Sequence, residues 1–149
     1  SNRATAVEGA LKIGEAVKLH ASNYEVEEFL HGPVFPINPD YTVFFYDSND
    51  EAGERILQVY RAVKKVTNRA YLITDRDLDD PDTIKTDIHI AEPLNPLAYL
   101  AVAPLIADHV SETLNTQIGF PPRRTIKQDV STKSEKHPRG AEEVQPLIF

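Results

Sequence analysis

The sequence predicts an α/β protein in which a parallel β-sheet lies between two layers of helices. Two runs of β-branched, aromatic and aliphatic residues, 42–46 (TVFFY) and 70–74 (AYLIT), have the unbroken apolar character of strands buried on both faces. Between them, apolar side chains recur at helical spacing over residues 49–66. Strands that alternate with helices form parallel sheets covered on both faces, so we predict a three-layer α/β/α sandwich.

Two helical segments are predicted before the first strand. Apolar and polar stripes at helical spacing indicate a helix over residues 4–19, and a shorter acidic helix over 25–30 ends at the Gly-Pro sequence of residues 32–33. After the first strand, Ser48 and Glu51 have the spacing of a capping box at the start of the next helix.

The second half of the chain is predicted to hold one more strand and a long helix. Residues 75–86 form an acidic loop, 87–91 (DIHIA) a third and shorter strand, and 93–114 a helix that is apolar nearly all round. A helix with this pattern lies either at the centre of a domain or in a subunit interface. In a chain of this size we expect the interface.

Composition limits the class of protein. With 149 residues, 41% hydrophobic and 26% charged, the chain has the size and composition of one ordinary globular domain. No apolar run reaches membrane-spanning length, and no secretory signal is visible. The lack of cysteine excludes disulfides and thiolate metal sites. We therefore expect a cytoplasmic protein without membrane contact.

The charge is unevenly distributed along the chain. Its net value is -7, which disfavours nucleic acid as a partner. Residues 1–122 hold 10 basic and 19 acidic side chains, whereas residues 123–139 hold six basic and two acidic ones. We predict a domain over 1–122 and a basic tail over 123–149 that folds back onto the domain or onto an anionic ligand.

The first two predicted helices carry the residues best suited to acid–base chemistry. Glu8, Lys12 and Glu15 share one polar face at spacings of four and three residues. In the second helix, two glutamates precede His31 by three and four residues. A carboxylate, an ammonium group and an imidazole close together are what proton transfer at a sugar carbonyl requires.

Each of these residues also has a structural interpretation. Glu8 and Lys12 are spaced as a surface ion pair, and Glu15 taken alone is a solvated helix residue. His31 before Gly-Pro can cap a helix C-terminus, and Lys127 in the basic tail is unremarkable by itself.

The sequence gives little support for a metal or nucleotide site. No phosphate-binding glycine loop and no H-E-x-x-H motif are present. The acidic residues of the loop lack the glycine and terminal glutamate of an EF-hand, and Pro81 interrupts them, so a solvated loop is preferred. These residues are Asp75, Asp77, Asp79, Asp80 and Asp82.

Three motifs together resemble a known family. They are E-G-A-L-K-x-x-E at 8–15, E-x-x-H-G-P at 28–33 and P-R-x-x-x-K at 122–127. Over residues 1–133 the chain resembles the second SIS (sugar isomerase) domain of phosphosugar isomerases, including the isomerase half of glutamine:fructose-6-phosphate aminotransferase and the ketosamine-6-phosphate deglycases. The resemblance implies a flavodoxin-like SIS fold, here a partial domain whose first strand is missing.

The resemblance also implies roles for individual residues. Glu15 matches the base that moves a proton between the first two sugar carbons. His31 matches the ring-opening histidine, which in this family reaches a neighbouring subunit's site. Lys127 matches a tail lysine that contacts the open-chain sugar, and Glu8 and Lys12 match residues that line the same pocket.

The function implied is that of a phosphosugar isomerase, deglycase or aminotransferase isomerase domain. It would act on a hexose 6-phosphate or its amino conjugate by aldose–ketose proton transfer, as a homodimer or higher homo-oligomer, with no metal or organic cofactor, and would be inactive alone if it is a fragment. The alternative is a non-catalytic SIS module that senses sugar phosphates or mediates dimerisation. One departure concerns the tail, where Phe120-Pro121 replaces the acidic residue that relatives have before Pro-Arg.

Overall fold

Three parallel strands form the sheet of the protein. A computed structural model describes residues 2–48, 51–87, 90, 94 and 96–116. The strands are β1 (Val43–Tyr46), β2 (Ala70–Thr74) and β3 (Thr83–Lys85), in the order β1-β2-β3. Both predicted strands with unbroken apolar character are therefore confirmed as β1 and β2. They pair in parallel with Val43 opposite Ala70.

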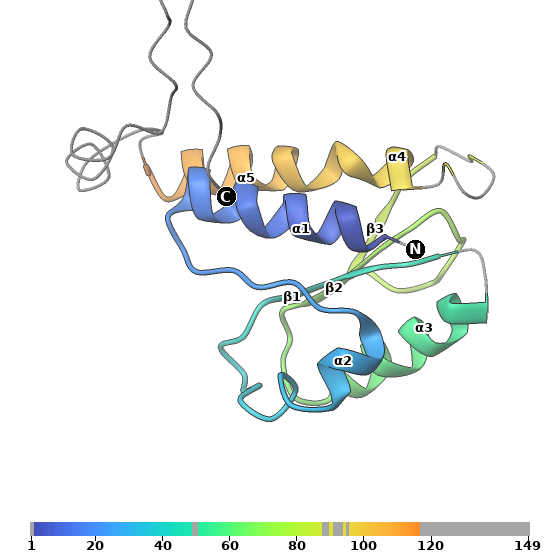
Figure 1. Cartoon of the computed structure of the whole chain (residues 1–149). Helices are drawn as coiled ribbons and strands as arrows, with labels where there is room; N and C mark the ends of the chain where they lie inside the picture. Colours follow the sequence, from blue (N-terminus) through green and yellow to red (C-terminus); the bar gives the residue numbers. More distant parts are fainter. Residues whose placement is uncertain (1, 49–50, 88–89, 91–93, 95, 117–149) are drawn as a thin grey trace, which may run out of the picture. The chain divides into compact units, whose positions relative to one another are not determined.

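Helices cover both faces of this sheet (Figure 1). On one face lie α1 (Arg3–Lys12), its continuation η1 (Ile13–Val17), α4 (Pro96–Leu100) and α5 (Val102–Thr113). On the other lie α2 (Val26–Leu30) and α3 (Glu51–Val63). The predicted three-layer α/β/α sandwich with a parallel sheet is confirmed.

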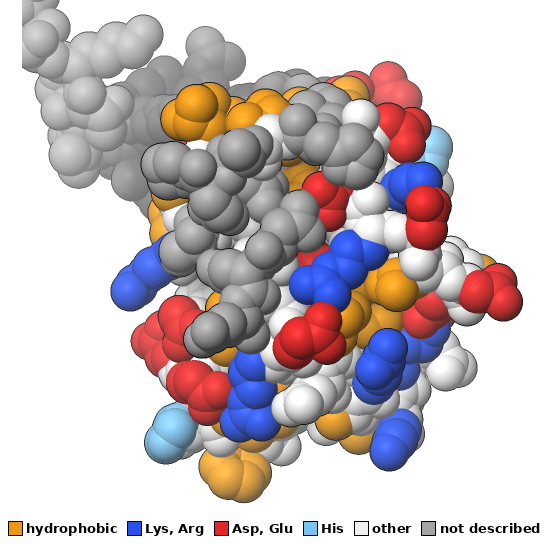
Figure 2. All heavy atoms as spheres, turned by 90° about the vertical axis from the view of Figure 1, so that its right-hand side faces the viewer, with side chains coloured by type: hydrophobic (Ala, Val, Ile, Leu, Met, Phe, Trp, Pro, Cys, Tyr) orange, Lys and Arg blue, Asp and Glu red, His pale blue; other side chains and the backbone are white. Residues whose placement is uncertain are grey.

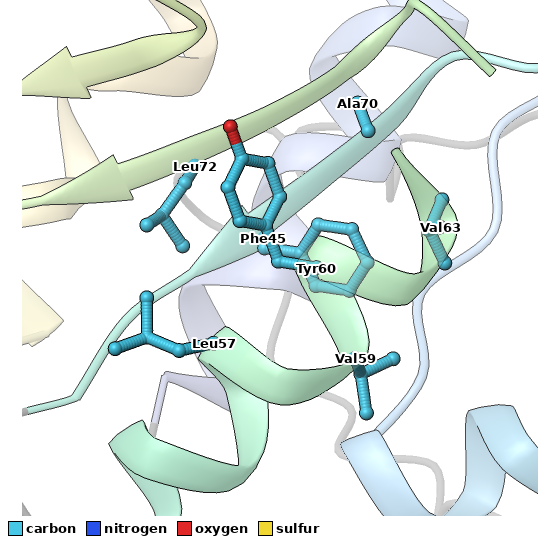
Figure 3. Close-up of a cluster of buried hydrophobic side chains, with 7 residues drawn as sticks. All are labelled: Phe45, Leu57, Val59, Tyr60, Val63, Ala70 and Leu72. Carbon is cyan, nitrogen blue, oxygen red and sulfur yellow. The ribbon is translucent and has the colours of Figure 1, made fainter. Parts of the chain in front are cut away.

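Alternate residues of the strands separate two hydrophobic clusters. Phe45, Ala70 and Leu72 point toward α3 and pack with its buried side chains (Figure 3). The Phe45 ring meets the Tyr60 ring edge to face, with centroids 5.7 Å apart. On the opposite face, Ile73 packs with Tyr99 of α4. This alternation is what a strand buried on both faces produces.

The first helix ends differently from its prediction. The predicted segment 4–19 forms α1 followed by the π-helical turn η1, whose backbone bonds span five residues rather than four. Lys18 ends it with a left-handed backbone conformation, φ 65°. The predicted helix over 25–30 is confirmed as α2, with Glu25 as its N-cap in a capping box with Glu28.

The third strand was predicted in the wrong place. It lies at Thr83–Lys85, inside the segment expected to be an acidic loop, whereas Asp87 and Ile90 are outside any strand. Residues 88, 89 and 91 lie outside the described part of the chain. Two backbone hydrogen bonds mark the ends of the pairing between β3 and β2. At the start, the Leu72 amide donates to the carbonyl of Asp82, and at the end the Thr86 amide donates to the carbonyl of Thr74.

The long helix predicted over 93–114 is two helices. α4 ends at Leu100 and α5 begins at Val102. Pro104 explains the break, because it has no amide hydrogen to donate to the carbonyl four residues earlier. Leu97, Leu100 and Leu105 are 59%, 42% and 68% exposed. The interface predicted for this segment remains a prediction.

Two other expectations fall partly outside the described residues. The predicted helix 49–66 is present as α3, but residues 49–50 and the side chain of Glu51 are not described, so the Ser48–Glu51 capping box stays a prediction. The same holds for the boundary at residue 122 and for the basic tail, because the description stops at Thr116. None of the described helices is long and apolar enough to cross a membrane.

Candidate functional site

The structure brings Glu8, Lys12 and Glu15 together on one side of α1 and η1. The Lys12 Nζ atom lies 3.4 Å from Glu8 Oε1 and 2.9 Å from Glu15 Oε2, so one ammonium group bridges two carboxylates. The three side chains are 34%, 38% and 52% exposed for Lys12, Glu8 and Glu15 respectively. This charged cluster is therefore accessible from solvent.

The π-helical turn carries Glu15. A π turn adds a residue to the helical repeat and changes the direction of the side chains after it, and such turns occur often at functional sites. Here the Lys18 Nζ donates to the main-chain oxygen of Glu15 at 2.7 Å, which fixes the backbone of the turn. The sequence analysis did not anticipate this turn, because five residues are too few to change the helical periodicity from which the segment was predicted.

Electrostatics keep Lys12 charged. The hydrogen bond to Glu15 is the largest cause that raises the pKa of Lys12, and the hydrogen bond to Glu8 adds to it. A carboxylate can accept a proton from carbon, and an adjacent ammonium group can stabilise the negative oxygen that results. The cluster thus has the chemical parts of an enediol-forming site.

His31 lies on the other side of the sheet. It ends α2, which packs with α3, whereas α1 and η1 pack with α4 and α5 (Figure 1). The Nδ1 atom of His31 donates to the main-chain oxygen of Glu27 at 2.6 Å, so the imidazole caps the helix. Within one chain the structure does not bring His31 to the Glu8–Lys12–Glu15 cluster.

Lys127 falls outside the residues that the structure describes, so its contact with an open-chain sugar stays a prediction. For Glu8, Lys12 and His31, the structure is also compatible with the purely structural interpretation given above. Glu8–Lys12 has the geometry of a half-exposed ion pair, and His31 caps α2. Neither observation conflicts with a catalytic role.

A second polar cluster, which the sequence analysis missed, lies at the carboxyl ends of the strands. Asp47 follows β1 and is 1% exposed; its Oδ2 accepts a hydrogen bond from Thr74 Oγ1 at 2.7 Å and forms an ion pair with Arg76 Nε at 2.8 Å. Burial raises the pKa of Asp47, and the contacts with Thr74 and Arg76 oppose this rise. Asp75 is also buried, so it is not part of a solvated loop as predicted.

Position could have revealed this cluster. Asp47 and Asp75 each follow a parallel strand directly, and the carboxyl ends of such strands meet at one edge, where α/β proteins commonly bind ligands. Figure 2 views the molecule from the right-hand side of Figure 1, where the strands end. On the described part of that face, basic and acidic side chains alternate.

Two other residues of the acidic run, Asp80 and Asp82, make structural contacts. Lys64 Nζ contacts Asp80 Oδ1 at 2.6 Å and Asp82 Oδ2 at 2.8 Å, and the Tyr60 hydroxyl donates to Asp80 Oδ2 at 3.0 Å. These contacts join α3 to the start of β3. Among the described residues, no three His, Asp or Glu side chains are grouped so as to hold a metal ion.

The fold and the charged cluster together define a class of protein. It is an α/β domain with a parallel sheet, and the first helix of the domain carries two glutamates and a lysine on one face. A solved structure of a protein from Clostridium difficile 630, assigned as a phosphosugar isomerase, superposes with a TM-score of 0.71. The match has 24% sequence identity and covers 89% of this chain and 37% of that one. It establishes the shared fold.

Sequence comparison points the same way. No family model matches the sequence. The chain is 30% identical over 132 residues to the glutamine–fructose-6-phosphate aminotransferase (isomerizing) of Photorhabdus laumondii, and 29% identical over 132 residues to those of Salmonella typhi and Escherichia coli K12. Each alignment covers 86% of this chain.

The two comparisons support an SIS (sugar isomerase) domain: the chain is similar in sequence to these isomerizing aminotransferases and shares its fold with the Clostridium difficile protein. The resemblance inferred from the three motifs is thereby confirmed. The chain spans about a fifth of the length of the aminotransferases it matches, 21% in each of the three.

Proposed function

We propose that the protein containing this chain is an enzyme that interconverts aldose and ketose forms of a hexose 6-phosphate or of its amino conjugate. The observation that carries this proposal is the bridge from Lys12 to Glu8 and Glu15. In this bridge a carboxylate and a cation of the E-G-A-L-K-x-x-E motif lie within hydrogen-bond distance of each other, which supports a role in proton transfer. The kinship with aminotransferases named as isomerizing supports the same class of chemistry.

The proposed reaction has two steps of proton transfer. His31 removes the proton of the anomeric hydroxyl and passes it to the ring oxygen, the ring C–O bond breaks, and the sugar opens to its carbonyl form. The Glu15 carboxylate then removes the proton from the carbon next to the carbonyl, and the enediol forms. The hydroxyl proton of the second carbon then moves to the former carbonyl oxygen, and protonated Glu15 returns its proton to the former carbonyl carbon, which completes the interconversion.

Cations stabilise the intermediate in this scheme. Lys12 is held beside Glu15, so its ammonium group lies near the oxygen that becomes negative when the enediol forms. We assign Lys127 of the tail, residues 123–149, to the same oxygen or its neighbour. Glu8 orients Lys12 from the other side. No metal or organic cofactor enters this scheme.

We propose that the site is shared between subunits of a homodimer or larger homo-oligomer. Glu15 and His31 lie on helices that cover opposite faces of the sheet, so one chain cannot present both to one sugar. A neighbouring copy has to supply one of them. We propose a cytoplasmic location, with a sugar phosphate as ligand, and a catalytic domain that covers residues 1–122.

Substitution of the base tests the proposal. In the intact protein, Glu15→Gln keeps the shape of the side chain but removes the proton acceptor, so we expect turnover of hexose 6-phosphates and fructosamine 6-phosphates to fall at least about 100-fold. Calorimetric binding of the sugar phosphate should be kept. Glu112→Gln on the exposed side of α5 is the matched control and should retain full turnover. Retained turnover in Glu15→Gln would remove Glu15 from the reaction.

A second candidate is a module that senses sugar phosphates or mediates dimerisation without catalysis. The exposed leucines of α4 and α5 favour it, because a monomer rarely leaves several large apolar side chains in one layer uncovered. Sugar-phosphate binding without turnover in the intact protein would support sensing. A concentration-independent monomer in analytical ultracentrifugation would exclude the dimerisation module.

A further inference from the structure

We propose that the C-terminal cap of α2 holds His31 as its Nδ1–H tautomer, and that Arg55 is a positioning residue which keeps α2 and its cap in place. The lone pair of the neutral imidazole then lies on Nε2, which becomes the atom that exchanges protons with the substrate. This inference rests on the proposed function only where it assigns proton exchange with the substrate to Nε2. The tautomer and the part played by Arg55 can be tested without any substrate.

The tautomer follows from the chemistry of the capping contact. His31 Nδ1 lies 2.6 Å from the main-chain oxygen of Glu27. A carbonyl oxygen has no hydrogen and can only accept, so Nδ1 must carry the proton. A neutral imidazole has one N–H, and therefore Nε2 has the free lone pair.

The backbone of the helix end requires this cap. The amide of His31 donates to the carbonyl of Glu28, three residues earlier, at 3.2 Å. The carbonyl of Glu27 thus loses the amide that would bond it in a continuing α-helix, and the imidazole takes that place. Capping and catalysis use different nitrogen atoms of the same ring.

α2 is too short to keep its position by itself. It has five residues, and in this fully described helix none is buried. A single helical turn is not stable in water without outside contacts. Phe29 supplies one of these contacts, since its ring meets the Phe45 ring edge to face with centroids 6.2 Å apart.

Arg55 supplies the polar contact from α3. Its Nε lies 2.7 Å from Glu27 Oε1 and its Nη2 lies 3.3 Å from Glu27 Oε2, a two-pronged pairing that fixes the carboxylate in both direction and rotation. The hydrogen bond from Arg55 is the largest cause that lowers the pKa of Glu27. Arg55 therefore fixes the side chain of Glu27, and the main-chain carbonyl of the same Glu27 holds His31.

Imidazole nitrogen shifts test the tautomer directly. The probe is the intact protein labelled with ¹⁵N-histidine, and His31→Gln identifies the His31 signals. With the ring neutral, we expect Nδ1 to show the shift of a protonated nitrogen and Nε2 that of an unprotonated one. The opposite assignment, with the proton on Nε2 as in most free histidine, would overturn the proposal.

Variants test the part played by Arg55. We expect Arg55→Gln to mix the two tautomers of His31 and to lower kcat about two- to fivefold, the size expected for loss of an exposed ion pair, with KM unchanged. Arg55→Lys, which keeps the positive charge, should restore part of the Nδ1–H tautomer population and part of kcat. Lys85→Gln breaks a different exposed ion pair, Lys85–Asp77, and should change neither the tautomer populations nor kcat.

The outcomes separate the two proposals. Tautomer populations that do not respond to Arg55→Gln would exclude Arg55 as a positioning residue, whatever the activity. If the protein turns over no sugar phosphate but shows the expected tautomer and its response to Arg55→Gln, the proposed enzymatic function fails while the structural inference stands.

Discussion

The two helical layers hold their candidate residues in very different ways. α1 is clamped into its layer: Thr5 is 1% exposed and donates to the carbonyl of Pro96, and Val17 at the end of η1 is 2% exposed. α2 on the other face has no fully buried residue: its apolar side chains are only partly buried against the core, and Arg55 of α3 pairs with its Glu27. The difference teaches that Glu15 sits on a rigid support, whereas His31 depends on few contacts that can be removed singly.

Gly9 tests the rigid layer and should give the largest loss of stability. A Cβ atom there would lie 2.8 Å from the Tyr46 hydroxyl and 3.2 Å from Ala103 Cβ. We expect Gly9→Ala to lower the free energy of unfolding by about 2 kcal/mol, more than the gain in helix propensity. Thermal denaturation measures it.

Gly32, directly after His31, is the matched control for this change. No atom lies within 4 Å of its would-be Cβ. Gly32→Ala should therefore change stability by no more than about 0.5 kcal/mol. Equal losses in the two variants would contradict the contrast between a tightly packed layer and a loosely held one.

Phe29→Ala tests the apolar support of α2. Phe29 is half-buried against the cluster around Phe45. Its loss should cost about 1–2 kcal/mol, less than a fully buried phenylalanine. Hydrogen exchange should show lost protection in α2 with little change in α1. Loss of protection in both helices would mean that the two layers unfold as one unit.

Lys64 tests how the α3 side depends on pH. Its hydrogen bond is the largest cause that lowers the pKa of Asp80. A carboxyl with a lowered pKa in the folded state stabilises the fold above the ordinary pKa of aspartate, and this contribution is lost as the pH falls through the lowered value. Lys64→Gln should lower stability by about 1 kcal/mol at pH 7.

Acid titration checks the same change. Below about pH 4 the gap in stability between Lys64→Gln and the parent protein should close, because Asp80 is protonated in the unfolded state and then in the folded state too. Urea denaturation at pH 7 and at pH 3 measures this. A gap that is the same at both pH values would show that Lys64 acts by packing alone.

Much of the fold could be predicted from the sequence where local pattern and tertiary packing agree. The strands β1 and β2 are apolar throughout, and α2 and α3 carry clear helical signals. β3 was missed because three residues within an acidic segment give no pattern, and its pairing depends on β2 alone. The break at Ala101 follows from Pro104, a signal that the apolar pattern around it concealed.

The site was predictable in part for the same reason. Helical spacing places Glu8, Lys12 and Glu15 on one face, and in the structure Lys12 contacts both glutamates. The cluster around Asp47 escaped detection because its members come from strand ends separated in sequence by 27 residues or more, as with Thr74. Long-range contacts of this kind need the register of the sheet.

The most direct measurement mixes two inactive variants of the intact protein. If each site takes Glu15 from one subunit and His31 from its neighbour, Glu15→Gln and His31→Gln should each lose activity, yet their hybrid dimers contain one complete site. Random mixing should restore about a quarter of the parent activity, since half of the dimers are hybrids with one working site of two. No recovery after subunit exchange, shown by mass spectrometry of the hybrids, would contradict a shared site.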